Sequence, residues 1–289
     1  MQRNLNYQND RPTLYLIPTP IGNLEDITLR SLKILETVDV LYAEDTRVTR
    51  KLLSHYNISK TTFSLHEHNE TVRYKEVVEK LDKGLNVGLV SDAGMPLLSD
   101  PGLILAKEVM AAGYNVTSLP GANALLPALA MSGLNTHPFA FFGFLDSKKN
   151  KRIKELERIK YYPETLIFYE AIHRINDTLE DMYEILGNRK FTIAREISKT
   201  YEEIISGELS EFAELGELKG ELVIVIEGYQ NEKKVDISLV EQVDFFVASG
   251  MKKTEAMKRV SEITGIPKNK IYEEYLNSHI KPTIKEKSR

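Results

Sequence analysis

The chain has 289 residues, of which 42% are hydrophobic and 28% are charged, so it can form two α/β domains with well-packed cores and a small appendage. It has no cysteine, which excludes disulfides, thiolate nucleophiles and cysteine-ligated zinc. The polar N-terminus and the lack of a long uncharged segment predict a cytoplasmic protein with no membrane partner.

The net charge of −4 is distributed unevenly. Residues 250–289 contain ten Lys or Arg and five Asp or Glu, a local charge of +5, so the preceding chain carries −9. A basic appendage on an acidic body is typical of a protein that binds nucleic acid through one end. The alternative is a solvated helical surface.

The first 125 residues alternate between strand-like and helix-like patterns. Five apolar runs are predicted strands: Leu14–Ile17, Val38–Ala43, Thr62–Leu65, Asn86–Val90 and Asn115–Leu119. Four segments with helical spacing lie between them: Leu29–Leu35, Thr49–His55, Val72–Lys83 and Leu103–Ala112. Gly84 and Gly113 are expected to end two of these helices. This alternation predicts a mainly parallel sheet covered by helices.

A second α/β series follows a predicted helix at Ala122–Met131. Its predicted strands are Phe139–Phe144, Thr165–Tyr169, Phe191–Arg195 and Leu222–Ile226, and its helices are Lys151–Lys160 and Ile175–Leu186. Tyr201–Leu209, with Ser206-Gly207 as the turn, is interpreted as a hairpin, so we expect a mixed sheet. Two α/β domains in series create a cleft between them where ligands commonly bind.

The C-terminal part of the chain is predicted to be helical. After a polar linker at Tyr229–Asp236, three short helices are expected at Val240–Ala248, Lys253–Thr264 and Lys268–Asn277. Their arrangement resembles a helix-turn-helix RNA-binding domain, and a dimerisation module is the alternative. The predicted domains are residues 1–122, 123–230 and 237–289.

Three glycine-bearing loops follow predicted strands of the first domain, at residues 18–24, 91–102 and 119–123. Loops at the carboxyl ends of strands in an open α/β sheet converge on one crevice, and glycine lets the backbone approach a ligand there. The loops match neither a dinucleotide fingerprint nor a phosphate loop. Asp92 in the second loop could accept hydrogen bonds from an amine or from ribose hydroxyls, and its alternative role is an Asx-turn.

Two histidines in HEHNE at residues 66–70 raise the question of a metal site. His66 and His68 would point to the same side of a strand end, but a zinc site needs a third ligand that the sequence does not offer. We therefore predict no metal and interpret this segment as a loop that contacts RNA or another domain.

Several segments together carry a family resemblance. They are LYLIPTPIGNLEDITLRSLKILETVDVLYAEDTRVTRKLL, HEHNE, LVSDAGMPLLSDPG, LPGANALLPALAMSG, FFGFL, TLIFYEAIHR, ARE and KGELVIVIEG. In this order and spacing they resemble the ribosomal RNA small subunit methyltransferase I family, strongly over residues 12–230 and more loosely over the C-terminal helices.

That family is similar in fold to the tetrapyrrole methylases. The resemblance implies two α/β domains of that type, S-adenosylmethionine bound in the cleft between them, and a homodimer. It implies 2′-O-methylation of a cytidine in the decoding region of 16S rRNA, with either free rRNA or the 30S ribosomal subunit as the partner. It also implies the cofactor-binding residues, which are Ile21, Gly22, Asp92, Gly94, Met95, Gly121, Asn123, Ala124, Tyr169 and Glu170.

Methyl transfer from a sulfonium to a ribose hydroxyl requires alignment of the reacting atoms and benefits from an acceptor for the hydroxyl proton. The candidates for this help are Glu44, Asp45, Arg47, His173 and Arg174. For Glu44 and Asp45 the alternative is a helix N-cap with first-turn charge. Arg47 and Arg174 could bind RNA phosphates or lie in solvent.

Two other functions remain open. A methyltransferase acting on a tetrapyrrole would share the fold, but a small substrate does not require basic C-terminal helices. A non-catalytic RNA-binding module would not require three loops of the cofactor-binding type.

Overall fold

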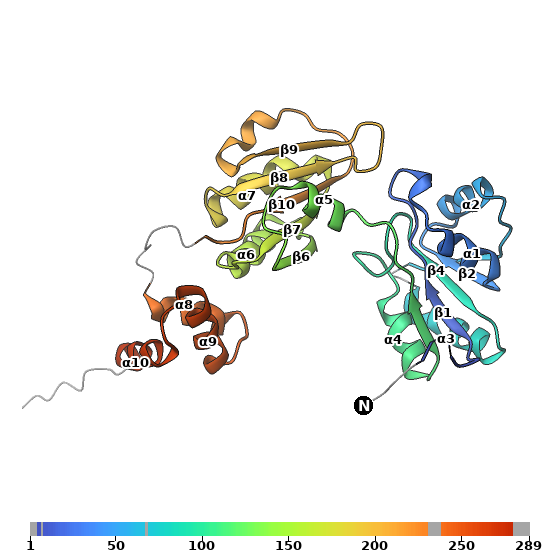
Figure 1. The fold of residues 1–289 in the computed structure, drawn as a ribbon, viewed down its shortest axis with the longest axis horizontal. Coiled ribbons are helices and arrows are strands. Elements are labelled where there is room, and N and C mark those ends of the chain that lie inside the picture. Colours follow the sequence, from blue (N-terminus) through green and yellow to red (C-terminus); the bar gives the residue numbers. More distant parts are fainter. Residues whose placement is uncertain (1–4, 7, 67–68, 231–237, 280–289) are drawn as a thin grey trace, which may run out of the picture.

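The computed structural model describes residues 5–6, 8–66, 69–230 and 238–279. They form two five-stranded sheets with covering helices, followed by three C-terminal helices (Figure 1). In Figure 1 the second α/β domain lies between the first domain and the C-terminal helices. None of the described helices is both long and apolar enough to cross a membrane.

The first sheet is entirely parallel, with the strand order β3-β2-β4-β1-β5. Its strands are β1 (Thr13–Leu16), β2 (Val40–Ala43), β3 (Thr62–Ser64), β4 (Val87–Val90) and β5 (Asn115–Ser118). Its helices are α1 (Leu29–Thr37), α2 (Thr46–His55), α3 (Glu70–Asp82) and α4 (Leu103–Ala111). All five predicted strands and all four predicted helices are confirmed. Gly84 and Gly113 follow the C-caps of α3 and α4 with φ of 83° and 86°.

Helices cover both faces of the first sheet, because alternate strand residues point to opposite sides. Tyr42 and Leu89 pack in a buried cluster with residues of α3 and α4. Leu41 and Val90, each one residue away in the same strands, pack with residues of α1 and α2. The apolar, doubly buried strands β2 and β4 therefore place their carboxyl ends, and the loops that follow, at one edge of a rigid core.

The second sheet is mixed, as predicted, with the order β6-β7-β10-β8-β9 and one parallel pair, β6 with β7. Its strands are β6 (Phe139–Phe144), β7 (Thr165–Glu170), β8 (Lys190–Arg195), β9 (Glu203–Glu208) and β10 (Leu222–Ile226). Its helices are α5 (Leu125–Met131), α6 (Lys149–Ile159) and α7 (Ile175–Leu186). α6 and α7 pack on one face and α5 packs on the other.

One predicted turn in the second domain is wrong. Ser206-Gly207 lies inside β9, where it pairs with Thr192 and Phe191 of β8. The hairpin turn is instead residues 196–202, where Glu196 and Ser198 have positive φ. β9 is an exposed edge strand, and small polar residues that resemble a turn in the sequence are tolerated there because the Ser206 hydroxyl bonds to Thr192 at 3.0 Å.

The three predicted C-terminal helices are confirmed as α8 (Leu239–Ala248), α9 (Lys253–Thr264) and α10 (Lys268–His279). They share a core that includes Val243, Phe246 and Ile271. The bundle contacts the second domain through an ion pair between Arg259 and Glu164 and through the rings of Tyr161 and Phe245, whose centroids are 4.9 Å apart. Most of the predicted linker lies outside the described residues.

Candidate functional site

A cavity of about 520 Å³ lies between the two α/β domains. Its first-domain lining comes from loops after β1, β2 and β4, namely Ile21, Glu44, Asp92, Ala93, Gly94, Met95, Leu98, Ser99 and Asp100. The rest of its lining is Asn123, Ala124, Phe144, Tyr169, Glu170, Ala171, Ile172, His173, Ala194, Ile197, Gly220, Glu221, Leu222 and Val223. The cavity is therefore placed where the carboxyl ends of the parallel strands open toward the second domain.

Hydrogen bonds tie the first-domain loops to one another. The backbone of Thr19 and the backbone of Gly94 exchange two hydrogen bonds of 2.9 Å, and the Thr19 hydroxyl donates to the Ser91 carbonyl at 3.1 Å. Asp92 Oδ1 accepts the backbone N–H of Asp45 at 2.9 Å. Asp92 thus joins the loops after β4 and β2, which is a structural role in addition to its place on the cavity wall.

Eight of the ten predicted cofactor residues line the cavity, and the exceptions are Gly22 and Gly121. A β-carbon on Gly22 would collide with Cγ of Lys199, and one on Gly121 would lie 2.6 Å from Cβ of Pro18. A side chain at either position would therefore force its neighbour, Lys199 or Pro18, to shift.

The predicted catalytic residues separate into two groups. Glu44 and His173 line the cavity, whereas Asp45, Arg47 and Arg174 do not. Asp45 is the N-cap of α2, as the alternative interpretation expected, and accepts the Arg47 backbone N–H at 2.7 Å. The Arg47 side chain bonds to the same carboxylate, which lowers the pKa of Asp45 to about 2. Arg47 is largely exposed.

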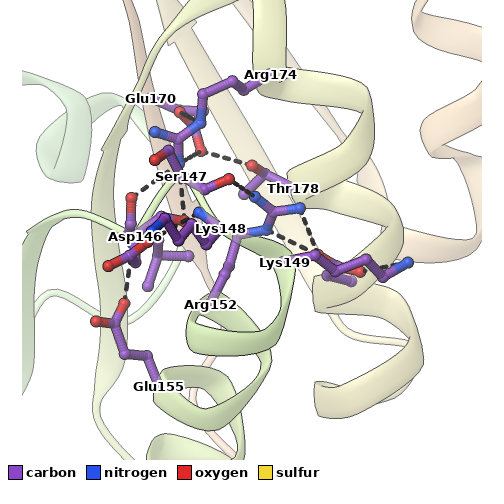
Figure 2. Close-up of polar contacts among 11 residues, drawn as sticks. Asp146, Ser147, Lys148, Lys149, Arg152, Glu155, Glu170, Arg174 and Thr178 are labelled. Atoms are coloured by element: carbon purple, nitrogen blue, oxygen red, sulfur yellow. Dashed lines mark hydrogen bonds and ion pairs between the residues drawn. The ribbon is translucent and has the colours of Figure 1, made fainter.

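Arg174 points into the second domain (Figure 2). Its Nη2 donates to the Leu145 carbonyl at 2.8 Å, and its Nε lies 3.3 Å from Glu170 Oε1. Glu170 is buried and also accepts the Thr178 hydroxyl at 2.6 Å and the Ala171 backbone N–H at 2.7 Å. Arg174 therefore holds the loop after β6 against the loop after β7, and most of its side chain is buried.

A second buried charge pair lies behind these loops. Arg152 of α6 bonds to Asp181 of α7 at 2.6 Å, and both side chains are almost fully buried. Lys149, drawn beside Arg152 in Figure 2, adds a contact of 3.1 Å to the other carboxylate oxygen of Asp181. Charged side chains thus join the two helices, α6 and α7, that pack on one face of the second sheet.

The turn of the β8–β9 hairpin reaches the first domain. The Ser198 hydroxyl bonds to Asp26, and the aliphatic part of Lys199 lies over Gly22. Lys199 Nζ is held by Glu196 at 2.8 Å and by Glu221, a cavity residue, at 2.9 Å. We call Gly22, Asp26, Ser198 and Lys199 the interdomain contact. It sets the spacing of the two domains on one side of the cavity.

Asp100 is a cavity residue that the sequence did not identify, although it lies in the same glycine-bearing loop as Asp92. Burial raises the pKa of Asp100 to about 7, with a further contribution from the negative charge of Glu44. A hydrogen bond from Ser91 opposes this rise. Phe144 was also missed, and its ring meets that of Tyr169 edge-on at 5.6 Å, which adds an apolar surface to the second-domain wall.

Among the residues that the structure describes, no group of three or more His, Asp or Glu could hold a metal ion. Glu67 and His68 of the HEHNE segment lie outside them.

The sequence and the fold were compared with known proteins. The family model described as tetrapyrrole (corrin/porphyrin) methylases matches residues 13–213. Solved structures that share the fold include two proteins of low sequence identity. One is a uroporphyrin-III-C-methyltransferase from Thermus thermophilus, with a TM-score of 0.52, 18% identity, and coverage of 74% of this chain and 94% of that chain. The other is a diphthine synthase, with a TM-score of 0.59, 14% identity, and coverage of 75% and 90%.

Curated relatives match nearly the whole chain. The ribosomal RNA small subunit methyltransferase I of Halalkalibacterium halodurans is 44% identical, over 95% of this chain and 98% of the relative. The proteins of the same name from Bacillus subtilis and Escherichia coli O157:H7 are 43% and 40% identical, over 97% and 94% of this chain and 98% and 97% of their own lengths. The chain therefore belongs to the tetrapyrrole methylase family, and it is a methyltransferase that uses S-adenosylmethionine.

Proposed function

We propose that the protein methylates the 2′-oxygen of a cytidine ribose in the decoding region of 16S rRNA, and that it acts in the cytoplasm as a homodimer. The cavity between the two α/β domains carries this proposal, because its walls suit a cationic methyl donor. The near full-length relatives named for small-subunit ribosomal RNA supply the class of acceptor.

The residues present fit S-adenosylmethionine. Glu44, Asp92 and Asp100 give the first-domain wall negative charge, which complements an ammonium and a sulfonium group. Leu98 and Val223 contribute apolar surface for a flat ring. When bound, the cofactor supplies an activated methyl group that needs no metal.

The chain's own task is then to bind, orient and exclude water. Asp92, Gly94 and Met95 would hold the cofactor from the first domain, where Gly94 allows close approach because it has no side chain. Asn123 and Tyr169 would hold it from the other side.

The C-terminal helices would contribute RNA affinity. Their exposed cations are Lys252, Lys253, Lys258, Lys268 and Lys270. Arg259 is instead half-buried and paired with Glu164, so it does not belong to this set. Exposed cations on one appendage neutralise phosphates without reading sequence.

A labelling experiment tests this function. Undermethylated 30S subunits and free 16S rRNA are each incubated with the protein and labelled S-adenosylmethionine, an added tetrapyrrole is tested in a third arm, and ribose methylation is mapped by mass spectrometry. We expect label on one 2′-oxygen of a cytidine in the decoding region. Label on an added tetrapyrrole with none on either RNA substrate would contradict the proposal, and the two RNA arms identify the preferred form of the substrate.

A further inference from the structure

Five acidic side chains line the cavity, and three of them are held by other groups of the protein. Glu170 accepts hydrogen bonds from Thr178 and from a backbone amide, and it lies beside Arg174. Glu221 is paired with Lys199, and Asp92 accepts the backbone N–H of Asp45. These contacts hold the walls of the cavity together, so these three carboxylates are poor candidates for a group that must exchange a proton in each turnover.

Asp100 occupies a different position, at the point where the first-domain loop meets the second domain. Ser99, next to it, has a φ of 69°, and its hydroxyl would lie 2.8 Å from a β-carbon placed on Gly143 of β6. Two residues after Asp100, Gly102 has a φ of 121°, and a β-carbon there would lie 2.6 Å from Leu89. Close packing on both sides therefore determines where the loop presents Asp100.

The charged and titratable groups around Asp100 come from both domains. The negative charges of Glu44, on the loop after β2, and of Asp92, on its own loop, both raise the pKa of Asp100. Across the cavity, burial raises the pKa of the Tyr169 hydroxyl, and the charge of Asp100 raises it further. Asp100 thus faces the space between the first-domain carboxylates and the second-domain wall.

We propose that Asp100 accepts the proton of the ribose hydroxyl during methyl transfer, an inference that rests on the function proposed above. The O–H bond breaks and its proton goes to the Asp100 carboxylate. The oxygen's electron pair forms the bond to the methyl carbon, and the bond from that carbon to sulfur breaks with its electron pair left on sulfur. Asp100 then releases the proton to water, so the enzyme returns to its starting state.

The electrostatics of the site agree with this role. A general base works best when its pKa is near the working pH, and burial together with the charge of Glu44 raises the pKa of Asp100 to about 7. The carboxylate is the active form, so activity should rise as the pH increases through this value and then level off. His173, which also lines the cavity, is the competing base.

The test is the pH dependence of single-turnover methyl transfer to the RNA substrate at saturating cofactor and RNA. We expect the wild-type rate to rise with pH to a plateau above about 7. Asp100→Asn should lower the plateau roughly 100-fold and remove the rise. Asp100→Glu should retain a rise with a lower plateau. Glu44→Gln should shift the midpoint of the rise to lower pH, because a negative charge next to Asp100 is lost.

Two results would overturn the inference. One is a rise that persists with the same midpoint in Asp100→Asn, and the other is a rise that disappears in His173→Gln while Asp100→Asn keeps it. In either case, methyl transfer to RNA by the wild type would still support the proposed function. If the wild type transfers no methyl group to RNA although it binds the cofactor, the proposed function fails and this inference fails with it. Thermal unfolding and cofactor binding of each variant show that the fold is intact.

Discussion

The two α/β domains build their halves of the cavity by different means. The first domain uses loops at the carboxyl ends of parallel strands, joined by backbone hydrogen bonds such as the pair between Thr19 and Gly94. The second domain uses side chains of its central strands and loops, held by buried charge pairs such as Arg152 with Asp181. The first half is held by hydrogen bonds between loops, most of them made by the backbone, and the second half is held by ion pairs between buried side chains.

The largest expected effect is a loss of folding stability when a buried ion pair of the second domain is broken. Asp181→Ala leaves the buried Arg152 without its partner, and we expect it to lower the free energy of unfolding by about 3–5 kcal/mol. The measurement is urea unfolding followed by circular dichroism. Glu262→Ala, which removes an exposed carboxylate 3.8 Å from both Lys258 and Arg259, is the control and should cost less than about 1 kcal/mol. Similar costs for the two variants would show that buried charge does not hold the second domain.

On the first-domain side, Asp92→Ala is expected to weaken S-adenosylmethionine binding by about 1–3 kcal/mol, because a charged acceptor is lost from the cavity wall. Asp92→Asn keeps an oxygen for the Asp45 backbone N–H while it removes the charge, so it separates the two roles of Asp92. Calorimetry in the presence of a chelator measures both variants. Unchanged affinity in a folded Asp92→Ala protein would leave Asp92 with only its structural role.

The interdomain contact joins the two halves of the cavity. It can be tested with one substitution that weakens cofactor binding and a second that restores it. Gly22→Ala places a β-carbon against the side chain of Lys199, and we expect this overpacking to weaken cofactor binding by about 1–2 kcal/mol. Lys199→Ala in the same chain should restore much of the loss, because it removes the colliding atoms. A loss in Gly22→Ala that Lys199→Ala does not reduce would mean that Gly22 is required for another reason.

The smallest effect on the two α/β domains is expected from deletion of residues 237–289. Both domains should remain folded with nearly unchanged cofactor affinity, because each has its own core. RNA binding should weaken and depend less steeply on salt, because fewer counterions are released. If the helices mediate dimerisation instead, sedimentation of the truncated protein would show a monomer. The salt dependence of its RNA binding would then be unchanged.

A matched variant keeps the helices but changes their charge. Replacing Lys252, Lys253, Lys258, Lys268 and Lys270 with Gln should reproduce the lower salt slope while leaving the bundle core unchanged. An unaltered slope would remove the case for RNA binding by this part of the chain.

The sequence by itself determined the order and type of the elements. In the first domain, apolar runs and helical spacing identified the five strands and the four α-helices, because each pattern reflects which side of an element is buried. The same local signals located the glycine loops, and Ile21, Asp92, Gly94 and Met95 from them do line the cavity. The sequence could locate these cavity residues because the carboxyl ends of parallel strands lie at the same edge of a sheet, so the loops that follow them lie close together.

Only the tertiary structure decided what several polar residues do. Ser206-Gly207 resembles a turn but pairs along an edge strand, and Arg174 resembles a phosphate ligand but is held by Glu170 and a carbonyl. Asp100 became a candidate base because burial and the charge of Glu44, more than fifty positions earlier in the chain, act on it together. Burial and the electrostatic field at a side chain are sums over neighbours that are distant in sequence, so no local pattern contains them.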